Sequence, residues 1–217
     1  HNPTGRVLTS GQLTRIVELA HEHDLIIVSD EIHYDLVHPG AEHVPTLTIP
    51  GASSCTIATT SGIKTFGIGG LCCAVTVCGD EQLHAGLAEI PENLLTAPNR
   101  FGCEASIAAW NTGDAWVDDL KAVLDANRHR LVDRLHAELP EVGVHLPEST
   151  FLAWLDLSAF DPGDRPSTWL RAQTGVACQS GPKFGIGAEG HVRLNFGTSP
   201  ALLDEIIDRL VAGLAHA

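Results

Sequence analysis

Two short β-branched runs, each followed by polar residues, constrain the fold of this chain most. Leu25–Val28 is a continuous apolar run bounded by charged residues, a pattern typical of a strand buried on both faces of a parallel sheet. Ser54–Thr60 is a second strand candidate, and Leu71–Cys78 is a third. In open α/β sheets a ligand binds outside the carboxyl ends of the strands. We therefore expect Asp30 and Lys64, which follow the first two runs, at one edge of the sheet.

Lys64 is the candidate reactive residue. It lies in the small-residue segment Thr59–Leu71, and it is the only charged residue between Glu42 and Asp80. Apolar surroundings lower the pKa of an ammonium group and favour the neutral amine, which attacks carbonyl carbons. From the residues alone, a structural lysine at a loop edge is the competing interpretation. Asp30 is similarly either a site residue or a helix cap or loop acid.

Charge and hydropathy exclude several classes of partner. The chain has 217 residues, of which 44% are hydrophobic, enough for one large domain or two small ones. A net charge of −14, with only 13 Lys and Arg residues, argues against nucleic acid or an anionic membrane as partner. No apolar run approaches the roughly 20 residues of a membrane helix, and the start does not read as a signal peptide. We expect a cytoplasmic protein with small molecules or proteins as partners.

Cysteines and histidines do not predict a metal site. The six cysteines lack metal-ligand spacing and are interpreted as free, buried thiols, with a vicinal redox pair at Cys72–Cys73 as the alternative. The twelve histidines include the neighbourhoods His21/His23 and His129/His136, but no Cys or carboxylate completes a ligand set there. These histidines are expected at the solvated surface.

Helix signals organise the remaining chain. Thr9 and Gln12 have capping-box spacing before a helix that should end near His23. A helical stretch from 103 to 139 is interrupted at Asn111–Asp114, which separates a long second helix from a shorter first one. Asp80 should cap a short helix. The rest is predicted to be α+β, with strands at 142–145, 151–157 and 191–196 and a helix beginning at Pro166.

The last helix has the clearest boundaries. Ser199 is the expected N-cap and Pro200 the first helical residue. A buried stripe is predicted at Leu202, Leu203, Ile206, Leu210 and Val211. Upstream, Gly185–Gly190 satisfies G-x-G-x-x-G, but it precedes a strand instead of opening a helix, so we do not interpret it as a dinucleotide fingerprint.

Four motifs, in order, carry a family resemblance. They are His1–Gly5, Asp30–His33, Ser61–Lys64 and Val192–Phe196. Together they resemble the motifs of the aminotransferase class I/II family of fold-type-I pyridoxal-phosphate enzymes. Their residues are most similar to those of the cystathionine β-lyase-like branch. The resemblance spans the whole chain but corresponds to roughly the C-terminal half of a family member. The glycine-rich phosphate turn and the ring-stacking aromatic that precede the first motif in the family are not in this sequence.

The resemblance implies an α/β fold of two parts. Residues 1–112 would be a partial fold-type-I large domain with a parallel-type sheet and helices. Residues 113–217 would be a linking helix and a small α+β C-terminal domain. A homodimer is implied as well. Because the three strand candidates lack neighbours and carry no protective charge or proline, we expect the chain by itself to self-associate and to hold pyridoxal phosphate weakly.

The resemblance also assigns roles to individual residues. Lys64 matches the lysine that binds the cofactor aldehyde and moves the Cα proton, and Asp30 matches the partner of the pyridine nitrogen. Asn2 matches the donor to the ring O3′, His33 occupies a slot near the same oxygen, and Ser61 matches a phosphate ligand. The family's phosphate arginine has no counterpart between Ile68 and Cys73.

Arg193 is the candidate substrate ligand. Alternation along its strand places Val192, Leu194 and Phe196 on one face and Arg193 on the other. In isolation this is an exposed arginine; in the family it clamps the substrate α-carboxylate, which the guanidinium fork suits.

Three functions follow from the resemblance. The first is a pyridoxal-phosphate-dependent C–S β-lyase that acts on cystathionine or a related cysteine conjugate and releases thiol, pyruvate and ammonia. The alternative is an aminotransferase, which uses the same residues. A third possibility, of another class, is a non-catalytic fragment or one chain of a split enzyme.

Overall fold

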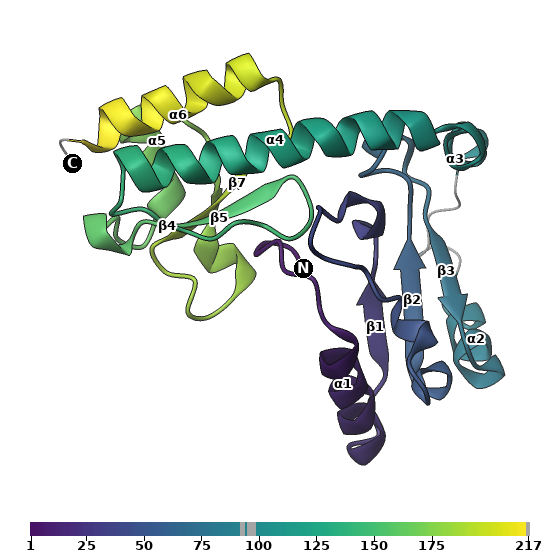
Figure 1. Ribbon diagram of the computed structural model, residues 1–217. Coiled ribbons are helices and arrows are strands. Elements are labelled where there is room, and N and C mark those ends of the chain that lie inside the picture. The colour runs from purple at the N-terminus through teal and green to yellow at the C-terminus, as the bar shows by residue number, and fades with distance from the viewer. Residues whose placement is uncertain (92–93, 95–98, 216–217) are drawn as a thin grey trace. The chain divides into compact units, whose positions relative to one another are not determined.

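The computed structural model of the chain describes residues 1–91, 94 and 99–215. These residues form helices α1 to α6 and strands β1 to β7, with short 3-10 turns between some of them (Figure 1). The α/β fold class predicted from the sequence is confirmed. None of the described helices combines the length and the apolar character needed to cross a bilayer.

The chain forms two compact units. The first unit consists of Val7–Val37 and Glu42–Asp119, and the second of His1–Arg6, His38–Ala41 and Leu120–Ala217. The second unit therefore takes two short segments from the N-terminal part of the sequence. The predicted division into independent domains at residues 112 and 113 stays a prediction.

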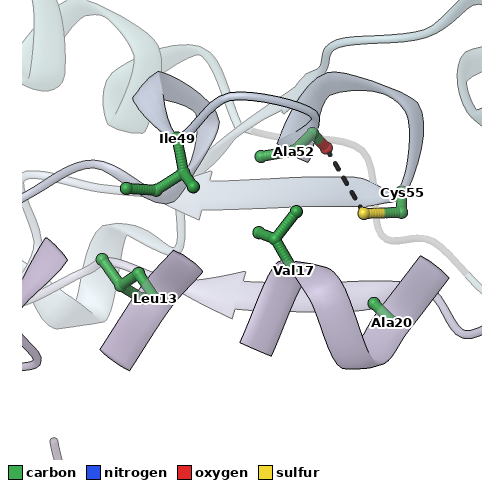
Figure 2. Packing of buried hydrophobic residues seen from close by; sticks show 6 residues of the cluster. All are labelled: Leu13, Val17, Ala20, Ile49, Ala52 and Cys55. Atoms are coloured by element: carbon green, nitrogen blue, oxygen red, sulfur yellow. Dashed lines mark hydrogen bonds between the residues drawn. The ribbon is translucent and has the colours of Figure 1, made fainter. Parts of the chain in front are cut away.

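Helix α1, Ser10–Glu22, begins as its capping box predicts. The Thr9 Oγ1 accepts a hydrogen bond from the Gln12 N–H at 3.3 Å, and the Gln12 Oε1 accepts one from the Thr9 N–H at 3.0 Å. These two bonds satisfy backbone donors that a helix start leaves unpaired. Figure 2 shows how Leu13 and Val17 of this helix face Ile49 and Ala52 of the turns before β2. This cluster is the apolar core of the first unit.

The sheet of the first unit has the order β1-β2-β3. Strand β1, Ile27–Asp30, runs parallel to β2, Thr56–Thr60, and β2 pairs antiparallel with β3, Val75–Cys78. Strands β2 and β3 are shorter than the sequence patterns predicted, and β1 begins two residues later than predicted. The antiparallel β3 follows directly from a loop, so no crossover helix is needed between β2 and β3.

The expectation that Leu25–Val28 is buried on both faces is wrong. Leu25 is 56% exposed, Ile26 59% and Val28 71%. Ile27 contacts the α1 cluster, so α1 covers the face of β1 opposite Val28. The run is apolar enough for a doubly covered strand, but the described residues cover only one face of it.

The helices of this part begin and end as expected. The Asp80 side chain caps α2, Glu81–Ala88, by accepting from two backbone N–H groups. Helix α3, Arg100–Thr112, stops at Gly113, and α4, Asp114–Glu138, is the longest helix, as predicted. A Cβ at Gly113 would lie 2.3 Å from the Phe66 Cε1, so this break requires glycine.

The second unit packs helices on an antiparallel sheet of order β4-β5-β7-β6. The predicted strands are β4, Gly143–Val144; β5, Leu152–Asp156; and β7, His191–Asn195. The two-residue β6, Gln179–Ser180, was not predicted because it is too short for a period to show. The helices are α5, Pro166–Thr174, and α6, Pro200–Leu214. The core of the second unit includes Leu131, Leu135, Leu155, Leu170, Val192, Phe196, Leu203 and Leu210.

Two details of the sequence prediction need correction. The buried stripe of α6 is Leu203, Ile207, Leu210 and Leu214, and Leu202 is 47% exposed, because the helix is rotated by about one residue from the predicted orientation. The thiols are free as expected, but only those of Cys55 and Cys73 are buried; Cys72 is exposed, and the other three are half-buried. It adopts φ 46° after the turn Gly69–Leu71 and so lies outside the strand that was expected to bury it.

The expectation that the histidines lie at the solvated surface is wrong for His38, which is buried in the second unit. Its side chain is 2% exposed, and its Nε2–H donates to the Thr150 carbonyl at 2.7 Å. Its Nδ1 is buried without a hydrogen-bond partner. Burial lowers the pKa of His38 to about 4, because a proton on Nδ1 would place an unsolvated charge in this core.

This pKa predicts a loss of stability in mild acid. The folded pKa of His38 lies below its usual value of 6.5, so the stabilisation is complete above pH 6.5 and is lost as the pH falls towards about 4. Between pH of about 8 and 5 the free energy of unfolding should fall by about 2 kcal/mol. His38→Gln, which keeps a donor to Thr150 and does not titrate, should flatten this part of the profile. Urea titrations at each pH would measure it; parallel profiles for both proteins would contradict the assignment.

The uncovered face of β1 predicts self-association. An exposed apolar edge strand is a template for pairing with another chain, and Leu25, Ile26 and Val28 are exposed here, with Asp30 as the one charged residue of β1. Val28→Lys should shift the protein towards monomers. Val123→Lys, at a 43% exposed position of α4, should not. Sedimentation velocity measures the distribution, and a wild-type protein that is monomeric throughout would show the prediction to be wrong.

Candidate functional site

The parallel pairing of β1 and β2 brings two predicted site residues to one edge. Their register pairs Asp30 with Thr59, so both strands end at the same side of the sheet. Asp30 is the last residue of β1, and its exposed carboxylate accepts from the Ile32 N–H at 3.2 Å. Lys64 lies in the turn that follows β2. The first unit therefore carries an acid and an amine at the carboxyl ends of neighbouring strands, as the sequence predicted.

Lys64 is half-buried, and its surroundings leave its amine available. Within the part of the chain that the structure describes, the amine has no hydrogen-bond or ion-pair partner. The next residue, Thr65, is fully buried and donates its hydroxyl proton to the Asp35 carboxylate at 3.0 Å. This bond ties the lysine turn to the segment after β1. The backbone of the turn is thus fixed while the amine remains free to react.

Ser61 and His33 belong to the same unit, with different surroundings. The buried Ser61 hydroxyl donates to the Cys73 carbonyl and accepts from the Ile63 N–H at 3.2 Å. Its only proton is therefore in use, and a phosphate contact would require the hydroxyl to rotate. His33 is half-buried just before the 3-10 turn Tyr34–Leu36. The roles expected for both residues stay predictions.

Glu31 is a residue of this edge that the sequence analysis missed. Its carboxylate accepts from the Thr46 N–H at 2.9 Å and from the Ser29 hydroxyl at 3.0 Å, and it pairs with His43 at 3.2 Å. Burial raises its pKa, but these donors outweigh burial and lower the pKa to about 2. Glu31 therefore anchors the long loop after β1 beside Asp30. Only the tertiary contacts distinguish it from a solvated acid.

Arg193 and Asn2 meet in the second unit. One terminal nitrogen of Arg193, Nη1, donates to the Asn2 Oδ1, and the other, Nη2, donates to the Gln179 Oε1. As predicted, Arg193 lies on the face opposite the buried Val192 and Leu194. Two residues that are 191 positions apart in the sequence are thus hydrogen-bonded, and both were predicted as site residues.

An aromatic group supports this guanidinium. The Arg193 Cζ lies 4.9 Å from the centre of the Phe184 ring, which contacts Trp154 edge-on, and Trp154 stacks on His191. Burial lowers the pKa of Arg193 from its ordinary value. Among the described residues no carboxylate pairs with it, since both of its side-chain partners are neutral amides. The positive charge therefore has no internal counter-ion and is suited to an anionic ligand.

The glycine-rich segment has no dinucleotide geometry. Gly185–Gly190 lies between the 3-10 turn Gly181–Phe184 and strand β7, so it does not open a helix. Three of its glycines have positive φ angles, which explains their presence as turn residues. In the part of the chain described, no three His, Cys, Asp or Glu side chains gather closely enough to hold a metal ion.

Comparisons with known proteins agree with the α/β fold. A profile of the aminotransferase class I and II family matches residues 1–210. The chain is 38% identical, over its whole length, to a putative cystathionine β-lyase of Mycobacterium leprae, of which it covers 56%. It is 34% identical to cystathionine β-lyase PatB of Bacillus subtilis, again over 99% of this chain and 56% of that protein.

Solved structures extend the comparison. The pyridoxal-phosphate-bound C–S lyase of Staphylococcus hominis is 30% identical and superposes with a TM-score of 0.91 over 99% of this chain and 56% of its own. Cystalysin of Treponema denticola, which contains pyridoxal 5′-phosphate, is 27% identical with a TM-score of 0.93, over 100% of this chain and 56% of its own.

The chain belongs to the aminotransferase class I and II family. Its family is pyridoxal-phosphate dependent and acts on amino acids. The chain spans about half the length of the relatives it matches. The side chains of the first unit fit this cofactor in kind, because the Lys64 amine and the Asp30 carboxylate lie at the same edge of the sheet.

The Glu31 anchor can be tested by charge removal. Glu31→Gln should lower the free energy of unfolding by about 1–2 kcal/mol at neutral pH, because the charge-assisted hydrogen bonds weaken. The folded pKa of about 2 lies below the usual 4.5, so this difference should be complete above pH 4.5 and shrink as the pH falls below it. Urea titrations measure it, with Glu42→Gln, an exposed acid without an ion pair among the described residues, as control. Equal stability of both variants would contradict the anchor.

Proposed function

We propose that this protein is a pyridoxal-phosphate-dependent C–S β-lyase acting on cystathionine or a related cysteine conjugate. The single observation that carries the proposal is the Lys64 amine, which has no partner among the described residues and lies at the same sheet edge as the Asp30 carboxylate. The names of the relatives support the lyase over other activities, since three of the similar proteins compared are cystathionine β-lyases or C–S lyases.

Pyridoxal phosphate, when bound, supplies an electron sink for the electron pair that a departing Cα proton leaves behind. In our proposal the Lys64 amine would hold the cofactor and, once the substrate amine has displaced it, would act as the base that takes the Cα proton. The Asp30 carboxylate keeps the pyridine nitrogen protonated. The Asn2 amide oxygen accepts a hydrogen bond from Arg193, so the amide nitrogen would be the donor to the ring O3′. His33 would be the second donor to that oxygen.

Arg193 would bind the substrate carboxylate. Its guanidinium has donors in a planar fork, and its two protein partners leave the charge uncompensated. The overall reaction converts a cysteine thioether and water into a thiol, pyruvate and ammonia. The C–S bond breaks, and the sulfur leaves with its electron pair and takes up a proton.

The runner-up is an aminotransferase, the activity that the name of the matching family states. An LL-diaminopimelate aminotransferase of Nitratidesulfovibrio vulgaris is 27% identical over 97% of this chain. The third alternative is a non-catalytic fragment or one chain of a split enzyme. It is motivated by the coverage of about half of each relative. A homodimer and a cytoplasmic location also belong to the proposal; the free thiols are consistent with a reducing compartment.

Product analysis separates these functions. With S-methyl-L-cysteine as substrate and no keto acid, the cofactor-loaded protein should release pyruvate and a thiol in equal amounts. Lys64→Ala should lower the rate by at least about 100-fold, because one group attaches the cofactor and moves the proton. Lys121→Ala, on α4, is the matched control.

Two outcomes would overturn the lyase. Dependence on an added keto acid would identify the aminotransferase. No turnover by either route, with cofactor bound, would favour the non-catalytic alternative. Independently of activity, borohydride reduction and peptide mapping should place the cofactor label on Lys64; label on Lys121 or Lys183 alone would remove Lys64 from the site.

A further inference from the structure

The register of the second sheet places Gln179 beside Arg193. The edge strand β6 pairs Gln179 with Arg193 of β7, and β5 pairs Trp154 with Arg193 from the other side. Cross-strand partners project from the same face of a sheet. Gln179 therefore reaches the guanidinium directly, and its Oε1 accepts from Nη2.

Counting donors shows what this contact leaves free. Each terminal nitrogen of a guanidinium carries two N–H groups. Asn2 takes one from Nη1, and Gln179 takes one from Nη2, which leaves one N–H on each nitrogen. Phe184 lies against the guanidinium, with its ring centre 4.9 Å from Cζ. The guanidinium is thus held in one orientation, and its remaining N–H groups, which include the Nε–H, are available as donors to the oxygens of a carboxylate.

We propose that Gln179 is a positioning residue that holds Arg193 in the orientation needed to bind the substrate carboxylate. This inference rests on the proposed function, in which Arg193 is the carboxylate clamp. A neutral amide suits this task because it restrains the guanidinium without cancelling its charge. A carboxylate at the same position would form an ion pair with Arg193 and compete with the substrate.

A pair of ligands that differ only in the carboxylate tests the inference. S-methyl-L-cysteine carries an α-carboxylate, and 2-(methylthio)ethylamine is its decarboxylated counterpart. Saturation-transfer NMR observes the ligand, needs only micromolar protein and tolerates self-association, so the 217-residue chain can be used as it is. The quantity measured is the ratio of the two dissociation constants, which is the carboxylate preference.

The expected preferences separate Gln179 from Arg193. Wild-type protein should prefer the acid by about tenfold or more, and Arg193→Met should abolish this preference. Gln179→Met, which keeps the side-chain size but removes the acceptor, should reduce the preference by about threefold to tenfold while leaving binding of the amine unchanged. Gln179→Glu should reduce it at least as much, although it keeps an acceptor. Gln173→Met, at an exposed position of α5, is the control and should match wild type.

Each outcome identifies what fails. If wild type shows no preference, or if Arg193→Met retains it, the proposed carboxylate clamp is wrong and the role of Gln179 falls with it. If Arg193→Met abolishes the preference but both Gln179 variants keep it, only the positioning role is wrong. Equal weakening of both ligands by Gln179→Met would indicate a structural effect and would also overturn the positioning role.

Discussion

The parallel pairing of β1 with β2 is the constraint on which the candidate site of the first unit depends. Its register places Asp30 opposite Thr59, so the turn that carries Lys64 begins at the same edge of the sheet as Asp30. Two further contacts stabilise what this pairing begins. Glu31 anchors the loop after β1 through three donors, and Asp35 binds Thr65 beside Lys64. The backbone at this edge is therefore held by buried polar contacts, and the Lys64 amine is not used in them.

The second unit holds a partly buried arginine, Arg193, that keeps its positive charge. A partly desolvated arginine is costly unless its donors are satisfied, and a carboxylate partner would satisfy them but would also neutralise the charge. This unit supplies amide oxygens from Asn2 and Gln179 and an aromatic ring from Phe184. The donors are partly satisfied while the charge remains. Such an arrangement is suited to binding an anion, which explains why the substrate carboxylate is the ligand we propose for it.

The sequence predicted much of this structure for physical reasons that are local. Capping residues determine where helices begin, and the capping box at Thr9 and the Ser199 cap are both found where predicted. The break at Gly113 and the long helix after it also follow from short-range signals. The predictions failed where burial was inferred from apolar character alone. Val28 is exposed although its run is apolar, because hydropathy predicts that a surface should be covered and not what covers it.

The sequence by itself determined the family, the strand ends that carry Asp30 and Lys64, and the face of β7 on which Arg193 lies, since motif order and a period of two are properties of the chain. Only the tertiary structure decided three hydrogen-bonding arrangements. Glu31 anchors the loop after β1, the Ser61 hydroxyl donates to the Cys73 carbonyl, and Arg193 donates to both Asn2 and Gln179. Each of these depends on residues between 12 and 191 positions apart. Hydrogen bonds of that kind leave no periodic trace in a sequence, because their partners are brought together by the packing of strands and loops.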